Sequence, residues 1–202
     1  MFFNFRKKKS LDNLYILALN AIFDGQDQKA LKILRKIVTD NTEHIYAYLQ
    51  IGNILRTQGN YLGAIKIHQS LTVRPKLDNS MLKEIHRALA LDFMEVKDLR
   101  KAEAEANLIL KFDKKNLWAN KFLLNIYEKN ENWIDAIKIC KVIEKLSNRA
   151  MDYKIKMSKY MTYEGRKQLE ENYLNEATKF FEKSKKVDPD NKLSELFLGN
   201  YF

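Results

Sequence analysis

The stretch GNILRTQGNYLGAIKIHQSL, residues 52–71, decides the fold. It joins two apolar, helix-forming segments through Gly59, and it places small residues at Gly52 and Ala64. Helix axes approach each other closely only where the side chains between them are short. Gly52 and Ala64 therefore predict the contact inside an antiparallel hairpin of two short helices.

The small residues return along the chain at a fixed spacing. Ala30 precedes Ala64 by 34 residues, and Ala102 precedes Ala136 by 34 residues. A period of this length is the signature of a helical repeat array. We expect an array over 11–202, with units at 11–44, 45–78, 83–116, 117–150 and 158–191 and a partial sixth unit at 192–202. Residues 79–82 and 151–157 are expected insertions, and residues 1–10 are expected to form a separate basic and aromatic segment.

The second unit resembles the tetratricopeptide repeat. In that pattern a large residue, a Leu-Gly pair, an aromatic residue, a turn glycine, an alanine and a late proline recur. The matching positions here are Tyr48, Ile51, Gly52, Leu55, Gly59, Tyr61, Ala64 and Pro75. The resemblance implies an all-α fold, a right-handed α-solenoid of tetratricopeptide helix hairpins.

The same stretch also resembles the corresponding repeat of the lipopolysaccharide assembly protein B family. The shared elements are Gly52-Asn53, Arg56, Gly59, Ala64-Ile65, Ile67-His68-Gln69 and Leu71. The resemblance implies a bacterial scaffold that controls lipopolysaccharide synthesis by bringing a synthesis enzyme under the control of a membrane protease. Members usually begin with a transmembrane helix and end with a four-cysteine, rubredoxin-like metal module. MFFNFRKKKS (1–10) is too short to span a membrane and Cys140 is the one cysteine, so the resemblance implies the protein-binding array alone.

Composition sets limits on function. The chain has 202 residues, and its 36 Lys and Arg exceed its 26 Asp and Glu, which gives a net charge of +10. This charge permits binding to acidic proteins, nucleic acid or anionic lipid. However, the basic residues are spread through every repeat, as is typical of a solvated surface. The single Cys140 excludes an internal disulfide and suits a reducing compartment, so we expect the cytoplasm, with the inner face of the membrane as an alternative.

No motif indicates catalysis, a cofactor or a metal. The three histidines, His44, His68 and His86, fall in different units and offer no close metal-ligand spacing. We expect His68 to be a packed or hydrogen-bonded helix residue, and Cys140 to be a buried, inert thiol. The expected protein is therefore not an enzyme.

The expected working surface is the concave side, which the first helix of each unit lines. Projection of the repeat register gives the groove residues Tyr15, Leu19, Phe23, Tyr46, Leu49, Asn53, Arg56, Arg87, Leu91, Met94, Trp118, Lys121 and Asn125. Exposed apolar surface that carries Tyr, Trp and Arg favours a groove for a protein or peptide partner. The alternative for Leu19, Ile22 and Phe23 is packing against the N-terminal segment or between helices.

Other partners remain open. Lys121 and Asn125 resemble half of the clamp with which chaperone-binding members hold a peptide C-terminus, but Tyr163, Leu193 and Phe197 stand where the other half would lie. Charge and aromatic residues permit nucleic-acid binding, although no repeated base-reading pair is visible. Peripheral membrane association would use Phe2, Phe3, Phe5, Arg6, Lys7, Lys8 and Lys9, and a frayed basic terminus is the simpler interpretation.

The segment KLSELFLGNYF (192–202) begins another first helix and stops at Phe202. Terminal units of repeat arrays normally carry a polar outer face. The apolar residues here make a poor cap: Leu193, Leu196, Phe197, Leu198 and Phe202. We expect either a fragment of a longer array or a face covered by another chain, including a homo-oligomer formed through the C-terminal end.

Overall fold

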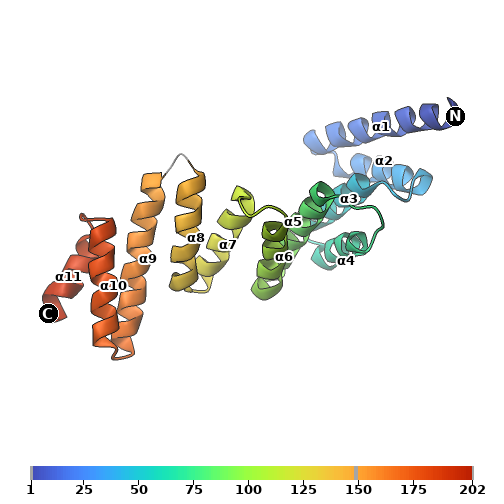
Figure 1. The fold of residues 1–202 in the computed structure, drawn as a ribbon. Helices are drawn as coiled ribbons and strands as arrows, with labels where there is room; N and C mark the ends of the chain where they lie inside the picture. Colours follow the sequence, from blue (N-terminus) through green and yellow to red (C-terminus); the bar gives the residue numbers. More distant parts are fainter. Residues whose placement is uncertain (1, 148–149, 202) are drawn as a thin grey trace. The chain divides into compact units, whose positions relative to one another are not determined.

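The computed structural model describes the backbone of residues 2–147 and 150–201, and the side chains of residues 10–147 and 150–200. All regular secondary structure in this part of the chain is helical (Figure 1). The helices form two compact units, Met1–Phe112 and Asp113–Phe202, and each unit is described by itself. The all-α fold of successive helix hairpins is therefore confirmed.

The first unit contains three hairpins. They are α1 (Phe2–Phe23) with α2 (Asp27–Asp40), α3 (Ile45–Thr57) with α4 (Tyr61–Thr72), and α5 (Asn79–Glu95) with α6 (Leu99–Phe112). The helix α2 also packs against α3, and α5 packs against both α3 and α4. Successive hairpins are therefore in direct contact, and the first helices α3 and α5 lie side by side.

The second unit continues the pattern with α7 (Leu117–Lys129), α8 (Trp133–Leu146), α9 (Ala150–Glu170), α10 (Leu174–Val187) and α11 (Lys192–Tyr201). Each of these helices packs against the next. Residues 151–157 lie at the start of α9, and residues 79–82 lie at the start of α5. Both expected insertions thus add turns to a first helix, and α1 likewise runs without a break through the expected boundary at residue 10.

The periodic small residues are required by close packing. Ala30, Ala64, Ala102, Ala136 and Ala177 are all completely buried. On the facing helices, a Cβ added at Gly52 would lie 2.3 Å from His68 Nε2, and one at Gly165 would lie 2.7 Å from Phe181 Cε1. The helices of these hairpins therefore approach as closely as the sequence pattern predicted.

Every hairpin turn contains one residue with a left-handed backbone. Gly25 and Gly59 have φ values of 71° and 79°, and Lys97, Glu131 and Asn172 take the equivalent places with 59°, 52° and 66°. A Cβ makes this region unfavourable, and glycine removes the cost. The turn conformation is thus retained where the turn glycine is absent, at Lys97 and at Glu131, with strain.

Glycine at these two turns is expected to stabilise the protein. Lys97→Gly and Glu131→Gly each relieve the steric cost of positive φ, partly offset by the greater freedom of glycine in the unfolded chain. We expect a gain of about 0.5–1 kcal/mol for each. Urea denaturation would measure the change, with Asn172→Gly as the control, because asparagine tolerates this conformation. An equal gain in the control, or a loss at both turns, would contradict the explanation.

A buried polar cluster holds α11 against α9 and α10. Ser194 Oγ donates to Ser184 Oγ at 2.7 Å, and Asn191 Nδ2 donates to Ser158 Oγ at 2.7 Å. Phe197 stacks on Phe181 with the ring centroids 5.0 Å apart. The other apolar residues expected to need cover, Leu193 and Leu196, are 45% and 57% exposed, whereas Phe202 lies outside the described residues. Association through this end stays a prediction.

Candidate functional site

A groove of about 340 Å³ lies between α3 and α5 of the first unit. We call it the α3–α5 groove, and its lining is Tyr46, Leu49, Gln50, Asn53, Arg56, Glu84, Arg87, Ala88 and Leu91. Six of these residues were predicted from the repeat register: Tyr46, Leu49, Asn53, Arg56, Arg87 and Leu91. The structure brings these six side chains around one hollow. That a partner occupies it stays a prediction.

The lining side chains differ in what they offer to a partner. Tyr46 is 37% exposed, Arg87 is exposed and Leu91 is half-buried. Leu49 is only 4% exposed. Leu49 therefore forms the floor of the groove, and its contact with a partner stays a prediction.

An ion-pair network that joins α3, α4 and α5 lies beneath the groove. Arg56 Nη1 donates to Asp92 Oδ1 at 2.8 Å, and Arg56 Nη2 donates to Asn53 Oδ1 at 2.9 Å. On the other side, His68 Nδ1 lies 2.6 Å from Asp92 Oδ2, and His68 Nε2 lies 3.2 Å from the Leu49 carbonyl oxygen. Asp92 and His68 are completely buried. A buried carboxylate is tolerated only when it is paired and hydrogen-bonded, as it is here.

The network changes the role assigned to Arg56. The sequence placed Arg56 in the groove as a contact for a partner, but its side chain is only 16% exposed and is held by Asp92 and Asn53. Its removal would leave the buried Asp92 carboxylate without its arginine partner, so a loss of binding after Arg56→Ala would not report on the groove alone. The expectation for His68, a hydrogen-bonded helix residue, is confirmed.

Sequence reasoning missed Asp92. A signal was present, because Asp92 is the one charged residue in the apolar run LALDFM (89–94) of a first helix. Such a residue, if the helix is buried on that side, must find a partner from a neighbouring helix. The sequence alone does not show that Arg56, 36 positions earlier, is that partner.

The surface of α1 adjoins the groove. Burial raises the pKa of the Tyr15 hydroxyl above its ordinary value, and the neighbouring Gln50 side chain partly offsets this rise. On the same helix, Phe23 is 93% exposed, so the alternative that Phe23 is packed between helices is wrong. Leu19 is 38% exposed, and its role stays a prediction. Ile22 does pack against the core. The remaining predicted residue of this unit, Met94, is half-buried on α5.

The predicted groove residues of the second unit lie on α7. Lys121 and Asn125 are exposed, and the half-buried Trp118 stacks on Phe122 with the ring centroids 4.9 Å apart. None of the three lines the hollow of about 640 Å³ found in this unit. Its lining is Glu131, Trp133, Tyr163, Arg166, Lys167, Glu170 and Glu171.

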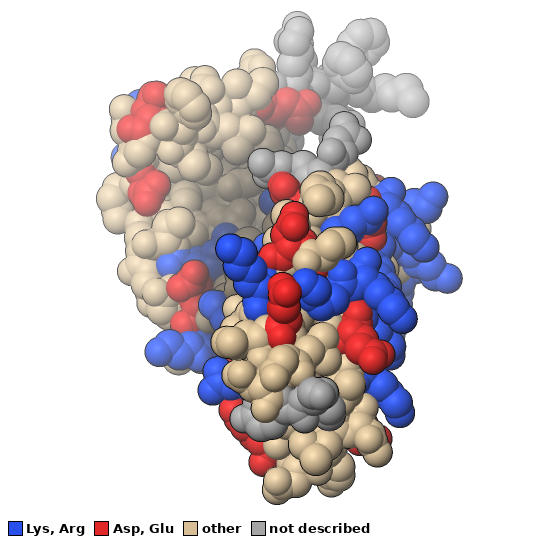
Figure 2. Space-filling view, turned by 90° about the vertical axis from the view of Figure 1, so that its left-hand side faces the viewer, with Lys and Arg blue, Asp and Glu red and all other residues tan. Residues whose placement is uncertain are grey.

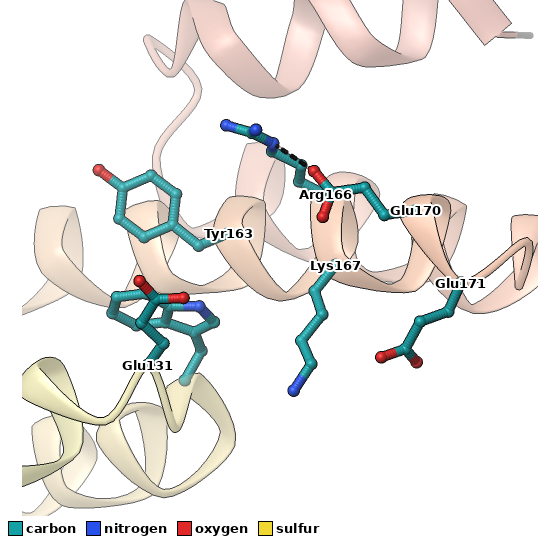
Figure 3. A pocket seen from close by; sticks show the side chains of 7 residues that line it. Glu131, Tyr163, Arg166, Lys167, Glu170 and Glu171 are labelled. Atoms are coloured by element: carbon teal, nitrogen blue, oxygen red, sulfur yellow. Dashed lines mark hydrogen bonds and ion pairs between the residues drawn. The ribbon is translucent and has the colours of Figure 1, made fainter.

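Charges in this second hollow are mixed. Arg166 Nε donates to Glu170 Oε1 at 2.9 Å, while Lys167 points away from this pair (Figure 3). Tyr163, which stands where a carboxylate clamp would need asparagine, lies against Trp133 with the ring centroids 5.0 Å apart. The hollow therefore has no row of convergent donors for a peptide C-terminus among its lining residues.

Reactive groups are few in the described chain. No set of three or more His, Cys, Asp or Glu side chains among the described residues is placed to hold a metal ion. Cys140 is buried, as expected, and burial raises the pKa of its thiol to about 12. No described helix is both long enough and apolar enough to cross a membrane. The side chains proposed for membrane contact, Phe2 to Lys9, lie outside the described residues.

Almost the whole length of this chain is similar in sequence to lipopolysaccharide assembly protein B. The protein of Escherichia coli strain K12 is 22% identical over 188 residues, which cover 93% of this chain and 48% of the relative. The protein of Haemophilus influenzae is 28% identical over 197 residues, which cover 92% of this chain and 48% of the relative. No family model matches the chain. The chain spans about half the length of the curated relatives it matches.

Solved structures share the fold. A tetratricopeptide repeat protein from Parabacteroides merdae has a TM-score of 0.64 at 16% identity, covering 92% of this chain and 70% of its own. MamA has a TM-score of 0.62 at 14% identity, covering 92% and 95%. YrrB, described as a TPR protein with an unusual peptide-binding site, has a TM-score of 0.58 at 11% identity, covering 92% and 90%. The chain therefore has the tetratricopeptide repeat fold.

Proposed function

We propose that this chain is a protein-binding scaffold, and that the α3–α5 groove holds an extended segment of a partner protein. The observation that carries the proposal is the gathering of six register-predicted side chains around one hollow, on the first helices of adjoining hairpins. The exposed apolar side chains of α1, the helix whose Tyr15 lies near Gln50, also support the proposal. The peptide-binding site of YrrB, a protein of the same fold, supports the proposal by analogy.

The lining indicates the chemistry of the segment. Tyr46 and Leu91 offer apolar contact area, and the amide groups of Gln50 and Asn53 can bond to the backbone of an extended peptide. Arg87 and Glu84 place charges of both signs at the groove. A segment that carries an apolar or aromatic side chain, flanked by polar residues, fits these groups.

Selection from a displayed library of random peptides would test the proposal with the whole chain as bait. We expect selected peptides to bind the wild type and to lose at least about tenfold in affinity to Tyr46→Ala and to Leu91→Ala, since central apolar contacts carry most of the binding energy. Leu62→Ala is the matched control, because Leu62 is 77% exposed on α4 and does not line the groove.

Charge is tested by a second pair of variants. Arg87→Ala should weaken the selected peptides that carry acidic residues, whereas Arg100→Ala, which removes an exposed arginine on α6, should not. Peptides that bind Tyr46→Ala, Leu91→Ala and Arg87→Ala as well as they bind the wild type would contradict the proposed site. Circular dichroism of each variant separates loss of binding from loss of fold.

We further propose that the scaffold serves lipopolysaccharide assembly and acts in the cytoplasm, at the inner face of the membrane. Similarity to lipopolysaccharide assembly protein B over 93% of this chain supports this role. Overproduction of the chain in a bacterium that makes lipopolysaccharide should change the cellular amount of this lipid. The same level with the wild type and with the combined Tyr46→Ala and Leu91→Ala variant would contradict a role through the groove.

A further inference from the structure

A second groove, on other helices, lies between α8 and α10 in the second unit. The helix α9 packs against both α8 and α10 and forms the floor. The groove has a volume of about 430 Å³. We call it the lysine groove, since its main lining residues are Lys141 and Lys145 from α8, Met157 and Met161 from α9, and Lys183 and Lys186 from α10.

The charge of this groove is nearly all of one sign. Four lysines line it against a single acidic residue, Glu144, whose carboxylate lies 3.8 Å from Lys154 Nζ outside the groove. None of the four lysines forms an ion pair with the described side chains, whereas exposed lysines elsewhere do, such as Lys138 with Asp135 at 2.8 Å. Lys and Arg also gather along one side of the part of the molecule nearest the viewer in Figure 2.

The lysines form the two facing walls of the groove. Lys141 and Lys145 are four residues apart on α8, and Lys183 and Lys186 are three apart on α10, so each pair shares one helix face. Like charges at these spacings repel each other, and the repulsion falls when an acidic partner binds. The four clustered lysines therefore favour the binding of an acidic partner more than scattered surface lysines would.

The floor and the walls also offer apolar contact. Met157 and Met161 are 4% and 7% exposed, and thioether side chains adapt readily to the shape of a partner. The methylene stems of the lysines add apolar wall while the ammonium groups stay at the rim. None of the residues that line the groove is aromatic, so it lacks the stacking surface on which single-stranded nucleic acid is held.

We propose that the lysine groove binds an acidic segment of a partner protein, with an apolar side chain seated on Met157 and Met161 between flanking Asp or Glu residues. This is an interaction surface additional to the α3–α5 groove. The lysine groove uses helices of the second unit only, so the two proposals are tested independently.

The probe is a fluorescein-labelled synthetic peptide of repeated Glu-Leu-Glu, measured by fluorescence anisotropy with the whole chain. We expect saturable binding that weakens as salt is raised, and at least a tenfold loss of affinity in the double variant Lys141→Glu, Lys183→Glu. The matched control is Lys66→Glu, Lys179→Glu, which makes the same change in net charge at exposed lysines outside the groove. This control should keep most of the affinity.

Two further peptides test the two parts of the proposal. Replacement of Leu by Ser should weaken binding through loss of the apolar contact, and replacement of Glu by Gln should abolish it. The double variant Lys141→Ala, Lys183→Ala repeats the test without introducing acidic groups, and circular dichroism verifies that each variant is folded.

The proposal is overturned by any of three results. The first is absence of saturable binding, and the second is an equal loss of affinity in the groove and control variants. The third is tighter binding of oligouridine RNA, or of phosphatidylglycerol vesicles, through the same lysines. The displayed-peptide selection at the α3–α5 groove is unaffected by each of these results, so failure of one proposal does not imply failure of the other.

Discussion

Replacing Asp92 with alanine is expected to lower the free energy of unfolding by about 3–5 kcal/mol, the usual loss when one partner of a buried ion pair is removed. Asp92 is completely buried, and its two carboxylate oxygens contact Arg56 at 2.8 Å and His68 at 2.6 Å. Alanine would leave both side chains without their acidic partner below the α3–α5 groove. The contacts between α3, α4 and α5 would weaken together, because the three residues come from these three helices.

Urea denaturation followed by circular dichroism measures this loss. Glu95→Ala is the matched control, since Glu95 is an exposed acidic residue on the same helix and should leave stability nearly unchanged. A loss at Asp92 no larger than at Glu95 would show that the network does not hold the hairpins together.

Gly52→Leu is the second substitution with a large expected effect. A Cβ at this position would lie 2.3 Å from His68 Nε2 and 2.6 Å from His68 Cε1. His68 is completely buried and is held by Asp92 and the Leu49 carbonyl, so its ring has little room to move. We expect a loss of about 1–3 kcal/mol, as is typical of overpacking, and a lower melting temperature.

Gly199 supplies the control for this substitution. It lies on α11, and nothing stands within 4 Å of the place where its Cβ would be. Gly199→Ala should therefore raise helix stability slightly, as replacing a helical glycine with alanine generally does. An unchanged melting temperature for Gly52→Leu would contradict the close packing of α3 on α4.

The fold was predictable because it depends on local, repeated features. Ala30, Ala64, Ala102 and Ala136 mark the close contact in successive hairpins, and all four are completely buried. The register that these residues set also located the six predicted side chains of the α3–α5 groove. Successive side chains of a helix are rotated by a constant angle about its axis, so the register determines which of them share a face. The helical conformation of residues 79–82 and 151–157 was not predictable, because extra helical turns and a loop can use similar residues.

Interactions between hairpins were not predictable in the same way. Arg56 and Asp92 are 36 residues apart, and Lys141 and Lys183 come from different hairpins. Whether such residues lie close together depends on how successive hairpins pack, and the pattern within one repeat does not specify that packing. For the same reason the lysines were interpreted as a solvated surface, although four of them line one groove.

Photo-crosslinking tests the central claim, that a partner segment lies in the α3–α5 groove, most directly. A peptide selected on the whole chain would carry a benzophenone group at one position, and mass spectrometry would identify the residues it joins after irradiation. We predict crosslinks to Tyr46, Asn53, Arg87 and Leu91 of α3 and α5, and their loss when unlabelled peptide competes. Crosslinks that fall instead on α2, α4 or α6, the second helices of the hairpins, would contradict the account.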